Sequence, residues 1–351
     1  MDALTALISA TVSLYVSPNA QVIEIQPIEM APHERGWSGA EIRRYRVRLS
    51  TGASLMLLTK TMHRKERCVL HELSQQGHAN VPFAFAEDLT SDTSVLTCMQ
   101  DLGAARVGIP SAEDSTPTSP ELDQQVAQAL AAIHARNLGR TDLTGWLPNA
   151  DPTYVTDFLV KAVWRDNWEQ SLASNATFAR EFARYTPALE KAGAQLAKSM
   201  QSLWAEGNAL TVTHGEVHGE HIMLHQGRPY FIDWGWTYYG PLYLDLPAYF
   251  TPHTVHHYWR ALNEHGVRIS ELDFMARYRE IGRYVGFKYL CSGMWIWPPG
   301  PTEVTGRRIL MLIQWAIDGT WPERAFAVSP VAWQKLLAEH QQRLHLSDTD
   351  A

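Results

Sequence analysis

The chain has 351 residues, of which 45% are hydrophobic and 19% are charged, and its formal net charge is -7. This length is enough to bury a large core and predicts one bilobal unit or two domains. Acidic and basic residues are interspersed, and no basic run could follow a phosphate backbone, so nucleic acid is not expected as a partner. No apolar run reaches the ~20 residues that a membrane span needs, so no membrane partner is expected either.

Two further features concern the cellular compartment. Cys68, Cys98 and Cys291 are far apart in the sequence and form no CxxC pair. This usage predicts reduced thiols in a cytoplasmic protein, not a disulfide framework. The apolar residues 1–16 include Asp2 and have no cationic leader, which favours an early helix or strand over a signal peptide.

The first hundred residues predict a small β-rich part with one helix. Tyr45, Val47 and Leu49 alternate with arginines, as in a half-exposed strand, and residues 54–58 return as a buried strand after a turn at Gly52. Further strands are expected at residues 22–25, 81–82 and 95–97. Residues 63–76 have apolar positions at helical spacing and end at Gly77, which predicts a helix.

The remainder of the chain predicts mainly helices. Residues 108–120 are rich in Pro, Ser and Thr and indicate a flexible connection. Strands at 210–213 and 222–232 are expected as a pair that interrupts the helical part. The predicted division is a first lobe at 1–103, a linker at 104–120 and a second lobe at 121–351. Helices are expected near residues 122–133, 154–172, 187–205, 272–295, 305–317 and 330–344.

The most informative stretch is HGEVHGEH at residues 214–221, followed after a short hairpin by FIDWG at residues 231–235. It resembles the catalytic loop and metal-binding segment of the aminoglycoside phosphotransferase and choline kinase-like family, usually written HGDxHxxN followed by an apolar pair and DW or DF. The sequence departs from that pattern twice. Glu216 stands where the family usually has Asp, and His221 stands where it usually has Asn.

The resemblance implies an α+β, protein-kinase-like bilobal fold and a nucleotide-dependent small-molecule kinase. Glu216 would be the catalytic carboxylate that orients the acceptor hydroxyl. Asp233 would hold Mg²⁺ that bridges the nucleotide phosphates. His221 is the second candidate metal ligand; it could ligate directly, hold a metal-bound water or touch no metal, because imidazole is softer than an amide oxygen. His214 would orient the loop and Asp245 would brace it.

The nucleotide, ATP or GTP, would bind to the first lobe. Small residues between two strands let backbone N–H groups approach phosphate oxygens, although a plain hairpin turn looks the same. Lys60 leaves a buried strand, where a lysine can contact phosphates if a carboxylate on the next helix holds it. Glu66 is the expected carboxylate, and Glu72 is the alternative. The candidate nucleotide residues are Gly36, Ser38, Gly39, Lys60, Glu66, Met99 and Gln100.

The acceptor is expected to be a small molecule with a hydroxyl group. The resemblance makes an antibiotic the first candidate, with resistance as the result, and a choline-, homoserine- or sugar-like alcohol the alternative. Tryptophans and few acids near the motif favour an acceptor that is less cationic than an aminoglycoside, such as a nucleoside antibiotic. A second copy of the chain, in a homodimer, stays open as a partner. The candidate wall residues are Trp164, Trp168, Trp234, Trp236, Trp295 and Trp297.

Two other classes of protein stay open at this point. A zinc hydrolase could use three of the histidines His214, His218, His221 and His225 with a glutamate base, although their spacing is not that of the helical HExxH motif. A nucleotide-binding scaffold without activity would also explain the missing Asn. The zinc interpretation leaves Lys60 and Asp233 without a role.

Overall fold

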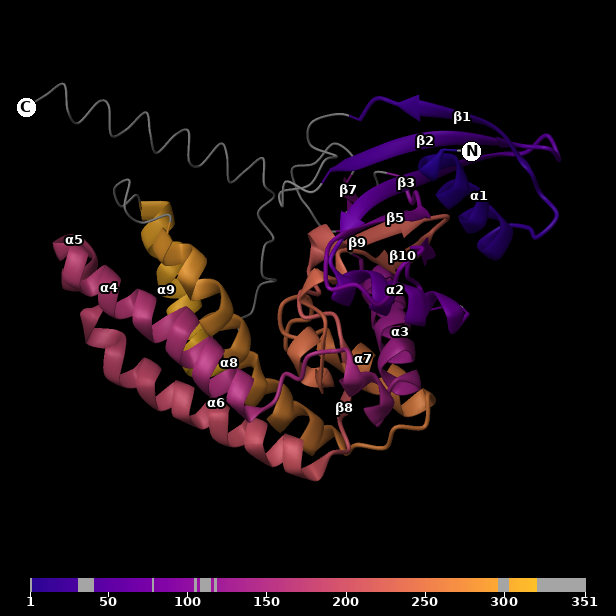
Figure 1. Cartoon of the computed structure of the whole chain (residues 1–351). Helices are drawn as coiled ribbons and strands as arrows, with labels where there is room; N and C mark the ends of the chain where they lie inside the picture. The colour runs from indigo at the N-terminus through magenta and orange to yellow at the C-terminus, as the bar shows by residue number, and fades with distance from the viewer. Residues whose placement is uncertain are drawn as a thin grey trace, which may run out of the picture. The chain divides into compact units, whose positions relative to one another are not determined.

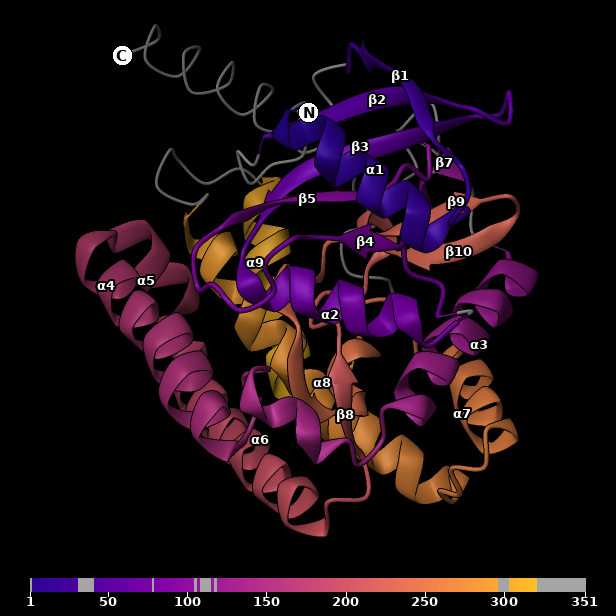
Figure 2. The ribbon, with the colours of Figure 1, turned by 45° about the vertical axis from the view of Figure 1, so that its right-hand side comes forward.

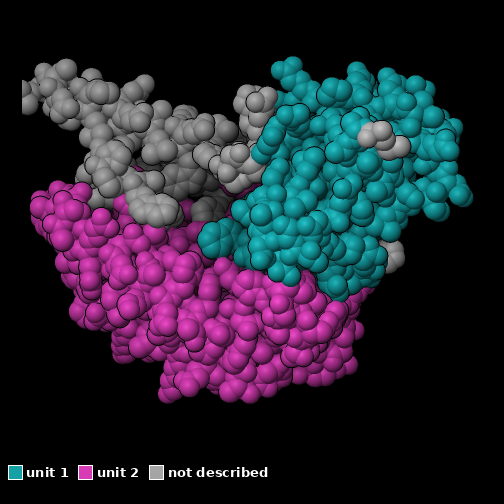
Figure 3. Space-filling model, in the orientation of Figure 1, with its two compact units in different colours: residues 1–106, 221–237 teal, residues 107–220, 238–351 magenta. Residues whose placement is uncertain are grey.

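The computed structural model describes residues 2–30, 41–77, 79–103, 106–107, 115–116, 119–295 and 303–320 (Figure 1). The chain divides into two compact units. The first contains residues 1–106 and 221–237, and the second contains residues 107–220 and 238–351 (Figure 3). Among the helices of the described part, none combines the length and the apolar character that crossing a membrane requires.

The first unit is built on a five-stranded antiparallel sheet with the strand order β1-β2-β3-β5-β4. The strands expected near residues 22, 45, 54 and 95 are all present. The strand expected at residues 81–82 is instead β4, two residues further on. The strand bounds are β1 Val22–Ile28, β2 Ile42–Leu49, β3 Ser54–Met62, β4 Ala84–Phe85 and β5 Val95–Gln100.

The N-terminal segment is a helix, α1 (Ala3–Tyr15), that packs on one face of this sheet (Figure 2). Asp2 caps it by accepting a hydrogen bond from the Thr5 N–H at 2.8 Å. Its apolar side chains meet those alternate strand residues that point to the same face, which follows from the period of two along a strand. The core they form contains Leu7, Ile8, Val12, Tyr45, Val47, Leu49, Leu57 and Cys98.

The helix expected at residues 63–76 is α2 (Arg64–Gln75). The first unit is completed by a hairpin that comes much later in the sequence, β9 (Ile222–His225) and β10 (Arg228–Phe231). Asn80 links the hairpin to the earlier part of the unit. Its side-chain amide donates to the Pro229 carbonyl at 2.8 Å, and its main-chain carbonyl accepts a hydrogen bond from the Phe231 N–H at 2.9 Å. The two distant parts of the sequence thus form one unit.

The second unit is mainly helical, as expected. The predicted helix at residues 154–172 begins as a π-helix at Tyr154–Arg165 and continues as α4. Residues 330–344 and most of 108–120 lie outside the described residues. The α-helices are α3 Pro120–Arg136, α4 Asp166–Ser174, α5 Ala176–Phe182, α6 Thr186–Glu206, α7 Val255–Glu264, α8 Glu271–Trp295 and α9 Glu303–Asp318.

The expected pairing of residues 210–213 with 222–232 is wrong. In the structure β8 (Leu210–Thr213) pairs with β11 (Tyr238–Pro241), while β9 and β10 pair with each other. The turn at Gln226 and Gly227, both with positive φ, joins β9 to β10 as a tight hairpin. Between β8 and the hairpin the chain leaves the second unit and enters the first.

Helix α8 is held against α9 by a very close approach. A Cβ atom on Gly282 would lie 1.7 Å from the Gly319 carbonyl oxygen, and one on Gly286 would lie 2.3 Å from the Ala316 nitrogen. Only glycine leaves room for backbone at these distances. The approach fixes the helix that carries Lys288, a residue of the site described next.

Candidate functional site

The first unit brings Lys60, Glu66 and Asp233 together, although Asp233 follows Lys60 by 173 residues. Lys60 lies on β3, Glu66 on α2, and Asp233 directly after β10 and Ile232. The Lys60 ammonium donates to Glu66 Oε1 at 2.6 Å and to Asp233 Oδ1 at 3.1 Å. Of the two glutamates considered as partners of Lys60, the structure places Glu66 in contact with it.

Burial and charge act in opposite directions in this group. Burial disfavours the charged ammonium, but attraction to Glu66 and Asp233 outweighs it and raises the pKa of Lys60. Burial also raises the pKa of Glu66, although Lys60 opposes that shift. Lys60 therefore remains a cation at neutral pH. The side chain of Asp233 is 46% exposed, so part of its carboxylate remains accessible to a ligand.

His221 lies beside Asp233 in the same unit. Its Nε2 atom is 3.5 Å from Asp233 Oδ2, and its carbonyl accepts a hydrogen bond from the Ile232 N–H at 2.9 Å. Ligand atoms at neighbouring positions around Mg²⁺ lie about 3 Å apart, given its metal–oxygen distances of about 2.1 Å. The two side chains therefore fit a divalent ion with modest adjustment. The carboxylate suits Mg²⁺, while the imidazole suits a softer ion.

Asp233 has a left-handed backbone, with φ 63° and ψ 60°. Aspartate is one of the few non-glycine residues that tolerate this conformation. The residues after it form a 3₁₀ turn, Trp234–Trp236, in which Trp234 is fully buried and donates its Nε1–H to the Phe231 carbonyl at 3.0 Å. The buried indole thus anchors the turn that presents the carboxylate.

The loop after β8, in the second unit, is organised by Asp245. This buried carboxylate accepts the His214 N–H at 2.6 Å and the Gly215 N–H at 2.7 Å. His134 Nε2 lies 3.1 Å from the same carboxylate. His214 Nδ1 in turn accepts the Glu216 N–H at 3.2 Å. The expectation that Asp245 braces this loop and His214 orients it agrees with these contacts.

The Glu216 carboxylate has partners on α8 that the sequence interpretation missed. Lys288 Nζ lies 3.0 Å from Glu216 Oε1 and donates to the Gly215 carbonyl at 2.7 Å, and the Tyr289 hydroxyl donates to Glu216 Oε1 at 3.5 Å. A signal was present in the sequence, because Lys288 is the one charged residue in the apolar run YVGFKYLC. The sequence analysis placed that run in the helix expected near residues 272–295 and gave it no part in the site.

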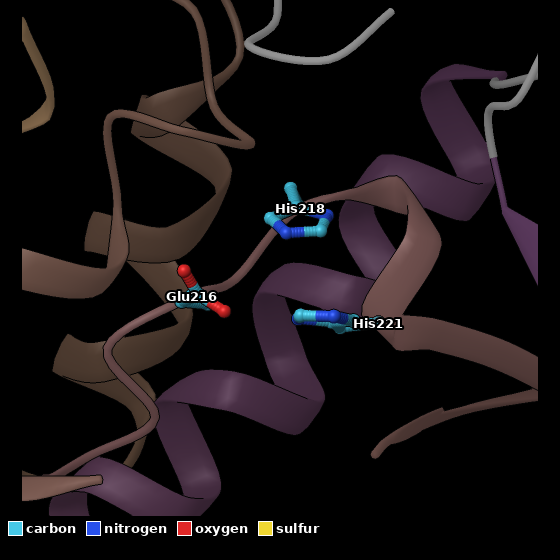
Figure 4. A group of neighbouring side chains, drawn as sticks. All are labelled: Glu216, His218 and His221. Atoms are coloured by element: carbon cyan, nitrogen blue, oxygen red, sulfur yellow. The ribbon is translucent and has the colours of Figure 1, made fainter. Parts of the chain in front are cut away.

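Figure 4 shows Glu216, His218 and His221 on the short segment that joins the two units. Glu216 and the buried His218 belong to the second unit, and His221 is the first residue of the returning segment of the first unit. The candidate metal ligands Asp233 and His221 therefore share one unit, and the candidate catalytic carboxylate belongs to the other.

The other candidate nucleotide residues are placed in part. Gly36, Ser38 and Gly39 lie outside the described residues. Met99 and Gln100 end β5, and the Gln100 N–H donates to the Phe83 carbonyl at 3.0 Å. That N–H therefore already has a partner within the protein. It is therefore not available as a donor to a nucleotide.

The tryptophans considered for the acceptor site are mostly core residues. Trp164, Trp168 and Trp234 are buried almost completely, whereas Trp236 is 42% exposed. The described residues give no side-chain placement for Trp295, and Trp297 lies outside them. The second unit also has an exposed aromatic side chain that is not a tryptophan. Phe158 is 42% exposed and stacks on Tyr154, with ring centroids 5.4 Å apart.

Comparison with protein families gives one match, to the model described as "Phosphotransferase enzyme family", over residues 34–280. No curated protein matches the sequence. Among solved structures, spectinomycin phosphotransferase APH(9)-Ia in complex with ADP and spectinomycin is similar, with a TM-score of 0.54 and 11% identity, covering 89% of this chain and 97% of that chain.

Amicoumacin kinase hAmiN, in complex with AMP-PNP, Ca²⁺ and amicoumacin, is similar with a TM-score of 0.50 and 13% identity, covering 91% of this chain and 94% of that chain. At these identities the likeness concerns the fold alone. It confirms the predicted α+β, protein-kinase-like fold, with an antiparallel sheet in the N-terminal part and a mainly helical C-terminal part.

Proposed function

The chain belongs to the phosphotransferase enzyme family, and from this premise we propose that it transfers the terminal phosphoryl group of ATP or GTP to a hydroxyl of a small molecule. The observation that carries the proposal is the Lys60–Glu66–Asp233 group. A charged lysine on a buried strand, fixed by a helix glutamate and next to an accessible aspartate, is the arrangement that holds nucleotide phosphates and their metal ion.

Each residue has a defined part in this reaction. Lys60 contacts the nucleotide phosphates, and Glu66 keeps the lysine side chain in place. Asp233, with His221 beside it, would hold Mg²⁺, which when bound supplies positive charge to the phosphate oxygens. Glu216 accepts a hydrogen bond from the acceptor hydroxyl and takes up its proton. Met99 and Gln100, with Gly36, Ser38 and Gly39, remain the proposed neighbours of the nucleotide.

We take an antibiotic as the first candidate for the acceptor and a metabolic alcohol of the choline, homoserine or sugar type as the second. A likeness of fold alone does not choose between them. A phosphate group on a drug adds charge and three acceptor oxygens, and would thereby disturb binding to the drug's target. A zinc hydrolase is less well supported, because it gives no role to the contacts of Lys60 with Glu66 and Asp233.

We expect the acceptor to carry few positive charges. The Lys288 ammonium lies 3.0 Å from the Glu216 carboxylate and compensates its charge, so this carboxylate would attract an acceptor with several ammonium groups only weakly. Phe158 offers an exposed ring for stacking. Nucleotide-dependent phosphorylation should be measured over a panel of nucleoside antibiotics, spectinomycin, polycationic aminoglycosides, choline and homoserine. Rapid turnover of several polycationic aminoglycosides, without any turnover of nucleoside drugs, would contradict this preference.

Replacing His221 by asparagine tests the second metal ligand. His221→Asn supplies the hard amide oxygen that the family motif has at this place, so turnover should shift towards Mg²⁺ and away from Mn²⁺ without being lost. Metal titrations of turnover and of Mn²⁺ binding measure the shift. His265→Asn changes an exposed histidine directly after α7, outside the motif, and serves as the control. Identical metal curves for His221→Asn and the parent would exclude direct ligation.

A further inference from the structure

Lys288 is a buried cation in the second unit. Its side chain is only 9% exposed, and it lies within α8 among apolar and aromatic residues. A buried ammonium is costly unless it is paired and hydrogen-bonded, so its retention requires partners that repay the cost. The family pattern described above assigns no role to this position.

The partners of Lys288 belong to the loop that carries Glu216. The ammonium donates to the Gly215 carbonyl at 2.7 Å and lies 3.0 Å from Glu216 Oε1, so a single group holds both the main chain before Glu216 and its carboxylate. Nζ also lies over the rings of Tyr284 and Tyr289, 5.9 and 5.4 Å from their centroids. These contacts leave the lysine little freedom to move.

The two ends of this contact differ in rigidity. Gly215 has a φ of 80°, a conformation that glycine adopts at little cost, and lies in an irregular loop. Lys288 lies on a 25-residue helix in which Gly286 contacts the backbone of α9 and Gly282 contacts that of Gly319, the residue after α9. The rigid helix can therefore fix the position of the loop, rather than the reverse.

Glu216 needs such support more than an aspartate would. Its side chain has one more rotatable bond than the Asp that the motif usually has, and therefore more conformations to lose when it is held in one geometry. An error of about 1 Å in the position of a reacting group can cost about 10²-fold in rate. A buried cation that contacts the carboxylate directly removes this freedom.

We propose that Lys288 is a positioning residue for phosphoryl transfer, one that holds the Glu216 carboxylate where it meets the acceptor hydroxyl. The inference rests on the proposed function. In the reaction the acceptor oxygen bonds to the terminal phosphorus, the bond from that phosphorus to the nucleoside diphosphate breaks, and the hydroxyl proton passes to Glu216. Lys288 keeps its own protons and acts only through Glu216 and the Gly215 carbonyl.

The charge state of Lys288 supplies a second readout. Burial lowers the pKa of Lys288, and the Glu216 and Asp245 carboxylates oppose the shift without cancelling it. Burial raises the pKa of Tyr284 and of Tyr289 well above the usual value, so both face the lysine as neutral rings; Arg308 acts on Tyr289 in the opposite sense. Lys288 thus loses its proton at a lower pH than an ordinary lysine, and turnover should fall on the alkaline side as it does so.

The test is a double-substitution cycle in the full chain, with ATP and the best acceptor from the panel. Lys288→Met should lower kcat by about 10²-fold, with little change in the KM for nucleotide. In the Glu216→Gln background the same substitution should cost almost nothing, because the carboxylate that Lys288 positions is absent. Lys198→Met removes an exposed lysine of α6 in the same unit and should behave like the parent.

Lys288→Arg keeps a cation that does not lose its proton in the accessible pH range. We expect its kcat to lie between those of Lys288→Met and the parent. The fall of its turnover at alkaline pH should begin at a higher pH than in the parent. The proposal would be overturned if Lys288→Met lowered kcat by the same factor in the parent and in the Glu216→Gln background. An unchanged kcat in folded Lys288→Met, or the same alkaline decline in parent and arginine variant, would overturn it as well.

The two proposals fail in different ways. If the parent protein phosphorylates no alcohol in the panel, the proposed function fails. If the parent is active and the cycle shows no coupling between Lys288 and Glu216, the proposed function stands and only the role of Lys288 is refuted. Should Lys288→Met not fold, which its melting curve would show, the arginine variant and the pH profile still decide the question.

Discussion

Asp233→Ala is expected to abolish phosphoryl transfer while the protein stays folded. The carboxylate next to Lys60 and His221 is the proposed holder of the metal ion, and a metal ion contributes several kcal/mol to such reactions. A loss of about 4 kcal/mol corresponds to about 10³-fold in rate. Turnover should therefore fall by at least roughly that factor, measured as nucleotide-dependent phosphorylation by purified protein with a native circular dichroism spectrum.

The backbone of Asp233 makes a control necessary. Alanine in a left-handed conformation costs about 1 kcal/mol, so Asp233→Ala also lowers the free energy of unfolding slightly. Asp233→Asn keeps a side chain that tolerates this conformation and removes only the charge. Both variants should lose turnover, and the alanine variant should have the lower melting temperature of the two. Turnover close to that of the parent in folded Asp233→Ala would refute the kinase assignment.

Glu216→Gln is expected to lose roughly 10²–10⁴-fold in kcat, the usual contribution of a positioned acid–base group. Glutamine has the same shape and cannot take up the acceptor's proton. The nucleotide should bind as before, because Lys60 and Asp233 belong to the other unit and are unchanged. Steady-state kinetics with the acceptor, and calorimetric titration with ADP, separate the two effects.

A second variant separates the effect of the carboxylate group from the effect of the length of the side chain. Glu216→Asp restores the usual family residue but shortens the side chain by one methylene, which draws it away from Lys288. Its kcat should lie between those of the parent and Glu216→Gln. An unchanged rate in Glu216→Gln would mean that another group takes the proton.

The elements that the sequence predicted best are those with strong local patterns. Apolar and polar residues alternate in β2, and apolar residues recur at helical spacing in α2, because each element turns one face towards the core. The structure has both elements where they were expected. The first helix was left open as helix or strand, because residues 1–16 are apolar without a clear period. The π-helical backbone of Tyr154–Arg165 could not be told from an α-helix, because residue propensities, apolar spacing and capping residues do not separate the two.

Long-range pairing was the part that local patterns could not supply. β8 and β11 are separated in sequence by the whole β9–β10 hairpin. The segment that follows β8 in the sequence was therefore taken for the partner of β8. Lys60 and Asp233 were assigned to one nucleotide site only through the family motif, and the hydrogen bond between their side chains was not predicted. Lys288 was missed for a related reason, because a single charge in an apolar helix shows neither its partner nor the direction of its side chain.

The division of the chain has a consequence for shuffling between related genes. The chain crosses from one unit to the other at residues 106/107, 220/221 and 237/238. A chimera joined once, near residue 106, would take Lys60 and Glu66 from one parent but Asp233, His221 and the β9–β10 hairpin from the other. The bonds of Asn80 to Pro229 and Phe231 would then join residues that were never selected together. Exchange of a complete first unit requires three junctions, with residues 221–237 transferred along with the N-terminal part.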